Sequence, residues 1–198
     1  MRAIIRKLGL RRAASVAGAL NLAYFGIEFA VALTIGSVSL FADSVDFLED
    51  ASVNLLIVLA LGRSLRQRAR LGMTLAGILL LPSLATVWMA WHKFLHPVAP
   101  APASLSITAA GAMLVNGGCA IMLARYRAHG GSLAKAAYLS ARNDVLANVA
   151  IILAGLVTAY LWRSAGPDII VGLGIAVMNA DAAREVWTAA HDEYRAVT

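Results

Sequence analysis

Charged residues are scarce in this chain of 198 residues: they make up 14% of it, whereas apolar residues make up 60%. A soluble domain usually carries about 25% charged residues. The few charges lie between long apolar stretches, and each stretch approaches the roughly 20 residues that a helix needs to cross a bilayer. This scarcity excludes an ordinary soluble domain. It predicts an all-α membrane protein with six transmembrane helices and no second soluble domain.

Cysteine and histidine, which supply the usual soft metal ligands, are also rare. The one cysteine, Cys119, lies in an apolar segment, so the sequence has no disulfide framework and no thiolate cluster. The four histidines fall near expected helix ends or in loops and show no ligand spacing: His92, His96, His129 and His191. We therefore expect no zinc-enzyme motif, no enzymatic activity and no cofactor beyond a divalent metal ion.

Glycine, proline and basic residues divide the apolar sequence into six expected helices. The helices are expected at about 13–35, 38–62, 71–95, 104–125, 136–162 and 167–188. They form one transmembrane domain over residues 13–188. A basic N-terminal segment, 1–12, precedes it, and a short polar tail, 189–198, follows it.

Lysine and arginine are concentrated on one side of this arrangement. Five precede the first helix, four lie in the connection 63–70, and the opposite side has only Lys93 and Arg163. The positive-inside rule then places both termini in the cytoplasm. The net charge of +6 thus reports topology rather than nucleic-acid binding. We expect a multi-pass protein in contact with lipid, in the inner membrane of a bacterium.

Acidic residues are concentrated inside the apolar segments, where a charge at the bilayer centre costs at least about 2.5 kcal/mol. The second expected helix carries Asp43, Asp46, Glu49 and Asp50 within eight residues, and the fifth carries Asp144. Such groups would be a heavy burden for a chain that has no use for them. They indicate a functional site.

Spacing arranges these residues in two stripes. Asp46, Asp50 and Asn54 share one helix face at intervals of four, and so do Ser140, Asp144 and Asn148. If the stripes face each other, oxygen ligands converge in an apolar bundle. Packed carboxylates cannot all stay ionised there, and a divalent cation or protons would neutralise them. Metal binding would then release protons, which suits a proton-coupled exchanger.

The roles of three acidic residues outside the two stripes are less direct. Glu28 lies seven residues after Asn21 on one helix face, and it either touches the ion path or is protonated and hydrogen-bonded to a neighbour. Asp43 is either an accessory ligand or a solvated residue at the mouth of the site. Glu49 points about 100° away from Asp50 on the helix and is interpreted as structural.

The sequence SVSLFADSVD at 37–46, followed by FLED at 47–50, resembles the second-helix signature of the cation diffusion facilitator (cation efflux) family. The run DVLAN at 144–148 resembles the matching segment of the fifth helix, and PDIIV at 167–171 resembles the start of the sixth. The resemblance covers nearly the whole chain. It implies six helices with both termini inside, and export of a divalent metal ion in exchange for protons.

Carried over residue by residue, the resemblance implies a transport site made by Asp46, Asp50 and Asp144, with Ser140 at the fourth position. Serine departs from the family pattern, so water or a neighbouring amide would complete the site. The accessory candidates are Asp43, Asn143, Asn148, Asn54 and Glu28. An all-oxygen set admits iron, manganese, cobalt or cadmium. Zinc, which also binds carboxylates, is expected first.

Family members usually continue into a cytoplasmic metal-sensing domain, whereas only about ten residues follow the sixth expected helix, too few for a domain. We therefore expect a short form whose homodimer is held by its third and sixth helices. Two alternatives stay open. One is a non-transporting subunit or metal sensor. The other is a membrane-embedded metal-dependent hydrolase, but such an enzyme usually needs histidine ligands in its helices, and this sequence has none with ligand spacing there.

Overall fold

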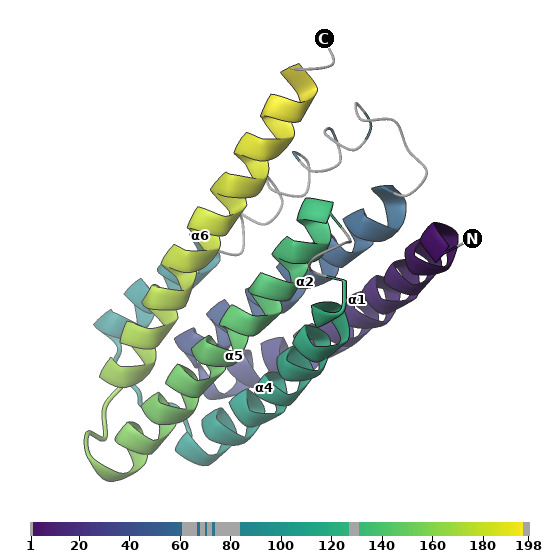
Figure 1. Ribbon diagram of the computed structural model, residues 1–198. Helices are drawn as coiled ribbons and strands as arrows, with labels where there is room; N and C mark the ends of the chain where they lie inside the picture. The colour runs from purple at the N-terminus through teal and green to yellow at the C-terminus, as the bar shows by residue number, and fades with distance from the viewer. Residues whose placement is uncertain are drawn as a thin grey trace.

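The computed structural model describes residues 2–60, 67, 70, 73, 84–126 and 131–195, and the regular structure in this part of the chain is entirely helical. Five helices are labelled in Figure 1: α1 (Arg2–Ile35), α2 (Val38–Ala60), α4 (Pro102–Ala124), α5 (Gly131–Tyr160) and α6 (Gly166–Arg195). Residues 84–95 form a sixth helical segment, where the second half of the third helix is expected. The expected all-α bundle of six helices is thus confirmed.

Two helix boundaries differ from the expectation. The first helix begins at Arg2, so residues 2–12 of the basic segment are the first part of α1. The last helix continues to Arg195, so most of the expected polar tail, including His191, is helical. Both ends extend the helices with residues that favour helix but not membrane burial. The first half of the third helix, with Pro82, lies outside the described residues.

Three of the described helices are long and apolar enough to cross a membrane by length and composition alone: Leu8–Ile35, Pro102–Ala124 and Ala137–Tyr160. Their outer faces carry large exposed apolar side chains, such as Ile107, Leu114 and Ile121 along one side of α4. Helix α2 is of similar length, but it carries four acidic residues within eight positions. Its neighbours supply the apolar surroundings instead, because α2 packs against α1, α5, α6 and α4.

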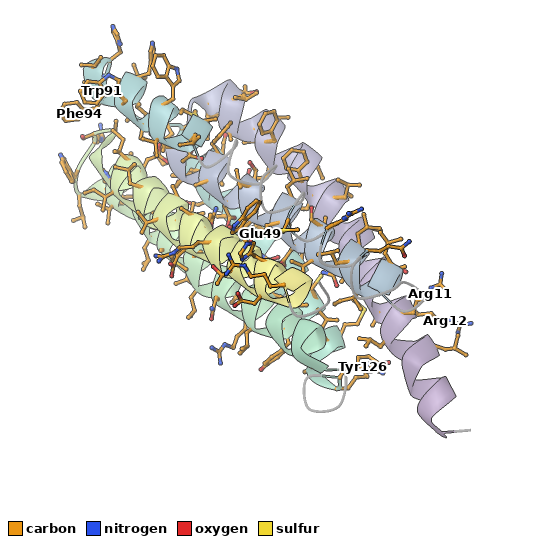
Figure 2. The ribbon with its side chains drawn as sticks, turned by 90° about the horizontal axis from the view of Figure 1, so that it is seen from above. Arg11, Arg12, Glu49, Trp91, Phe94 and Tyr126 are labelled. Carbon is orange, nitrogen blue, oxygen red and sulfur yellow. The ribbon has the colours of Figure 1, made fainter. Side chains whose placement is uncertain are left out.

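The two ends of the bundle have different side chains. Figure 2 shows Arg11, Arg12 and Tyr126 near one end of the bundle. Trp91 and Phe94 lie at the other end, and Glu49 lies between the two ends. The first turns of α1 and the last turns of α6 lie at the same end (Figure 1). We call this the terminal end and the opposite one the far end. Consecutive helices run in alternating directions between the two.

A glycine makes the tight connection between α1 and α2 at the far end. Gly36 has a φ of 62°, the left-handed conformation that favours glycine at the end of a helix. The Ser37 N–H closes the turn on the Ala32 carbonyl at 2.9 Å. Helix α2 therefore starts directly beside the end of α1, and the two helices pack along their length.

A buried ion pair joins α2, α6 and the segment 84–95 at the far end. The Lys93 Nζ donates to Asp168 Oδ2 at 2.9 Å and also to the Gly36 carbonyl. Asp168 further accepts from the backbone N–H groups of Val38 and Ser39 and from the hydroxyls of Ser37 and Ser39, at 2.6 to 3.1 Å. We call these residues the Asp168 network. It gives the first turn of α2 hydrogen-bond partners that a bilayer could not provide.

Two apolar clusters fill the bundle on either side of its middle. One includes Ala17 of α1, Ile57 of α2 and Ala141 of α5. The other includes Ala32, Ala42 and Ala147 of the same three helices. Buried polar side chains lie between these limits on each helix: Asn21 and Glu28 on α1, Asp43, Ser44, Glu49, Asp50 and Asn54 on α2, and Asp144 on α5. A group of buried polar residues therefore separates the two apolar clusters.

Candidate metal centre

The polar stripes of α2 and α5 face each other. The two helices pack against each other in opposite directions. A residue further along α2 therefore lies at the same height on the bundle axis as a residue nearer the start of α5. Ser140 lies within hydrogen-bonding reach of Asp50, and the carboxylates of Asp46 and Asp144 are within electrostatic range of each other. Asn148 lies beside Asp43. Three cross-helix pairs therefore follow one another along the bundle axis.

Helix α1 adds a polar side chain at two of these levels. Asn21 lies at the level of Asp50, and Glu28 lies beside Asp43. We call Asn21, Asp50 and Ser140 the proximal set, because it is nearer the terminal end. The distal set is Glu28, Asp43 and Asn148. Asp46 and Asp144 lie between the two sets, and together these eight residues form a polar column.

One oxygen of Asp50 is held and the other is free. The Asn21 Nδ2 donates to Asp50 Oδ2 at 3.3 Å, and the Cys119 thiol of α4 lies 3.7 Å from Asn21 Oδ1. The Asp50 side chain is buried, yet its Oδ1 has no hydrogen-bond partner. A buried carboxylate oxygen without a donor is costly unless a cation or a proton occupies its free position. Asp50 is thus held in a fixed orientation with one oxygen open.

The asparagines that end the two stripes have matching roles. The Asn54 Nδ2 donates to the Asp50 carbonyl at 2.8 Å, and the Asn148 Nδ2 donates to the Asp144 carbonyl at 2.8 Å. Both amide oxygens are buried without a partner. Each stripe therefore presents an amide oxygen one turn beyond its aspartate, and these oxygens are available to accept from a proton donor or to bind a cation.

The distal set is the most completely buried part of the column. Glu28, Asp43 and Asn148 are each 0% exposed. Neither oxygen of Glu28 and neither oxygen of Asp43 has a hydrogen bond of good geometry. The interpretation of Asp43 as a solvated residue at the mouth is therefore wrong, because α1 and α5 cover it.

Other candidate residues lie at the edge of the column or away from it. Asp46 and Ser140 are half-buried, so they are the more accessible members. Asn143 is exposed and its Oδ1 accepts from Arg142 at 3.3 Å, so the structure does not bring it to the column. Glu49 is buried and within electrostatic range of Asp46, Asp50 and Asp144. It therefore adds negative charge beside the column.

The carboxylates do not form a closed cage in this structure. Among the described residues, no group of three His, Cys, Asp or Glu side chains lies close enough together to hold a metal ion. Like charge on neighbouring carboxylates favours such separation. The geometry is that of a chain of neighbouring carboxylates along the bundle axis.

Several functional contacts were not expected from the sequence. The hydrogen bond from Asn21 to Asp50 joins residues 29 positions apart, and the pair of Lys93 with Asp168 joins residues 75 positions apart. Asn21 did carry a signal, because it shares a helix face with Glu28. Lys93 was interpreted only as a topology residue. Its burial at 7% exposure shows that it is part of the core at the far end.

The sequence profile of the cation efflux transmembrane domain matches residues 14–190. The chain belongs to the cation efflux family. The match includes every member of the polar column and the Asp168 network. A search of curated proteins finds no match.

Cation efflux proteins are transporters rather than enzymes, and this chain is accordingly a divalent-cation transporter of the membrane. Within this cation efflux protein, the column is the part of the described core that offers unpartnered acidic oxygens.

Proposed function

We propose that the protein exports a divalent transition-metal ion from the cytoplasm in exchange for protons, with zinc as the first candidate. Iron, cobalt, cadmium and manganese follow. The observation that carries the proposal is the free Oδ1 of Asp50, which is buried, unpartnered and held in place through Oδ2. An ion is the natural partner for such an oxygen.

In this proposal the transported ion binds between the proximal set and the middle of the column. Asp46, Asp50 and Asp144 supply the carboxylates, and Ser140 or a water molecule completes the site. The ion is cargo, so the site needs to close around it only transiently. The packing of α2 on α5 supports this assignment, because it places Asp46 opposite Asp144 and Asp50 opposite Ser140.

Proton exchange follows from the crowding of acidic groups. Carboxylates of like sign in a dry core are neutral in part or are neutralised by a cation. A metal ion that binds displaces the protons, and protons that return displace the metal ion. Glu49 strengthens this coupling, because its charge acts on the three aspartates.

The proposed direction rests on the distribution of basic residues. Arg11 and Arg12 are exposed near the terminal end. At the far end, the one lysine of segment 84–95, Lys93, is buried and paired with Asp168. By the positive-inside rule, the terminal end faces the cytoplasm. The proximal set is then the side from which the ion arrives.

Metal flux in proteoliposomes tests the proposal. We expect Zn²⁺ flux by the wild type, accompanied by proton movement in the opposite direction, and loss of both in Asp50→Asn and in Asp144→Asn. Ser52→Ala is the matched control, because Ser52 lies on α2 off the stripe and donates to the Leu48 carbonyl. Equal flux in all four proteins would show that the assigned site is wrong. No flux in the wild type would favour a non-transporting subunit or sensor.

Ser140→His tests whether position 140 touches the ion. An imidazole favours zinc over manganese, whereas a hydroxyl gives little preference. We expect the ratio of Zn²⁺ flux to Mn²⁺ flux to rise in the variant. An unchanged ratio would remove Ser140 from the site while leaving the three aspartates in place.

We propose that a homodimer forms through the third and sixth helices. An apolar groove of about 310 Å³ lies between segment 84–95 and α6, lined by Trp91, Phe94 and Leu173 among others. Leu173→Cys should crosslink two chains in the membrane with a short bifunctional maleimide. Leu156→Cys, at a similarly exposed position on α5, should not. Equal crosslinking of both variants would contradict this interface.

A further inference from the structure

Three helices repeat a polar side chain at nearly the same interval. Asn21 and Glu28 on α1 are seven residues apart, as are Asp43 and Asp50 on α2, and Ser140 and Asn148 on α5 are eight apart. A helix rises 1.5 Å per residue, so the two sets lie about 10 Å apart along the axis. That distance is too long for one ion to touch both. The distal set is a separate place in the core.

The distal set has more acceptors than the surrounding residues can satisfy. Five oxygens are buried without a hydrogen-bond partner: two of Glu28, two of Asp43 and Oδ1 of Asn148. Most buried polar atoms in folded proteins have a partner. An ionised carboxylate without one is costly in an apolar interior. The set is therefore complete only with bound protons or with a cation.

Most donors close by are already used. The Tyr24 hydroxyl donates to the Thr108 carbonyl at 2.7 Å. One hydrogen of the Asn148 Nδ2 goes to the Asp144 carbonyl, which leaves the second one for Asp43. The ammonium of Lys93 is held by Asp168 and the Gly36 carbonyl. Tyr24 instead adds an aromatic wall, because its ring packs against Phe47 with centroids 5.0 Å apart.

We propose that Glu28, Asp43 and Asn148 form a second divalent-cation site, about two helical turns from the proximal set and one turn beyond Asp46 and Asp144. Carboxylate and amide oxygens from α1, α2 and α5 supply the ligands, a donor set that suits divalent cations without a thiolate or imidazole. The inference rests on the proposed transport function only in treating the polar column as the route of the ion.

A shared proton is the competing occupant. One proton between Glu28 and Asp43 supplies a single donor, and a proton on each carboxyl supplies two, whereas five oxygens lack a partner. Neither arrangement gives every oxygen a partner. A divalent ion binds several oxygens at once and neutralises both carboxylates. The number of unpartnered oxygens therefore favours the ion.

Zn²⁺ binding to the full chain in lipid nanodiscs tests the site, by equilibrium dialysis and metal analysis. The background is the double variant Asp50→Asn/Asp144→Asn, which removes the transport site. We expect this background to retain one class of bound Zn²⁺. Adding Glu28→Gln should abolish it, and adding Asp43→Asn instead should do the same. Adding Glu49→Gln, which removes another buried carboxylate of α2, should leave it bound.

Two outcomes would overturn the inference: no bound Zn²⁺ in the background variant, or bound Zn²⁺ that persists after both Glu28→Gln and Asp43→Asn. A monodisperse size-exclusion profile establishes that each variant is folded, and the two distal substitutions serve as independent tests of one another. Failure of the proposed function looks different. Wild-type protein would then move no Zn²⁺ in proteoliposomes, while Glu28-dependent binding would remain.

Discussion

Two groups of buried carboxylates in this bundle have opposite surroundings. Asp168 accepts five hydrogen bonds, one of them from the ammonium of Lys93. Glu28 and Asp43 are just as buried, and neither has a hydrogen bond of good geometry or a cation beside it. The functional group and the burial are the same. The difference lies in whether the protein supplies the partners.

This difference separates structural from transport roles. A carboxylate whose partners all come from the chain fixes the positions of the helices that provide them, as Asp168 does for α2 and segment 84–95. A carboxylate that the chain leaves without partners is complete only when a guest is bound. Loss of the first should damage the fold, and loss of the second should damage binding.

Asp168→Asn should have the largest effect on stability. It leaves the buried ammonium of Lys93 without its counter-ion, and removal of one partner of a buried pair typically costs about 3–5 kcal/mol. We expect a large drop in the unfolding midpoint in detergent. The double variant Lys93→Met/Asp168→Asn should lose less than the sum of the single variants. If the Asp168→Asn variant unfolded at the wild-type midpoint, Asp168 would have no structural role that distinguishes it from Glu28 and Asp43.

Zn²⁺ should stabilise the wild type more than the Asp50→Asn variant, which keeps only the distal set. A ligand that binds only the folded state at a hundredfold excess over its Kd adds about 2.7 kcal/mol. Thermal unfolding with and without Zn²⁺ measures the effect, with Ser52→Ala as the control. A gain of equal size in Asp50→Asn would show that the free Oδ1 does not bind the ion.

Gly172→Ala should disturb the helix contact beside Asp168 without touching the column. A Cβ at this position would lie 2.7 Å from the Val38 carbonyl carbon, too close for the backbones of α6 and α2. Overpacking of this kind costs about 1–3 kcal/mol. Gly174→Ala is the matched control, because nothing lies within 4 Å of its Cβ. Equal unfolding midpoints would contradict the close approach of the two helices.

Cys119→Ala should have the smallest effect. It removes the thiol beside Asn21 Oδ1, so the amide that orients Asp50 is held less firmly. We expect unfolding to change by no more than about 1 kcal/mol. The apparent affinity for Zn²⁺ in a flux assay should fall by about tenfold at most. Cys119→Ser, which keeps a donor, should resemble the wild type. Identical affinities in all three proteins would exclude this positioning role.

Much of the arrangement could be predicted from the sequence, because it depends on local periodicity. Apolar runs and glycine or proline breaks identify the helices, and intervals of four residues identify the stripes of α2 and α5. The predicted start of α1 was wrong, because the criterion of apolar sequence excludes the basic residues up to Arg12, whereas the helix already begins at Arg2. The same reason accounts for the continuation of α6 past residue 188.

Contacts between distant residues could not be predicted in this way. The pairing of Lys93 with Asp168 and of Asn21 with Asp50 depends on how the helices are rotated about their axes. A single sequence does not specify that rotation. The division of the acidic residues into satisfied and unsatisfied groups depends on it as well, since Asp43 and Asp168 differ in their neighbours and not in their type.

The Asp168 network also has a mechanical consequence. It fastens α2 at its first residues, so this end acts as a fulcrum for any tilt of the helix. Asp43 lies five residues beyond Val38, about 7.5 Å along the axis, and Asp50 lies twelve beyond it, about 18 Å. A given tilt therefore moves Asp50 more than twice as far as Asp43. Such a tilt would change the proximal set more than the distal set.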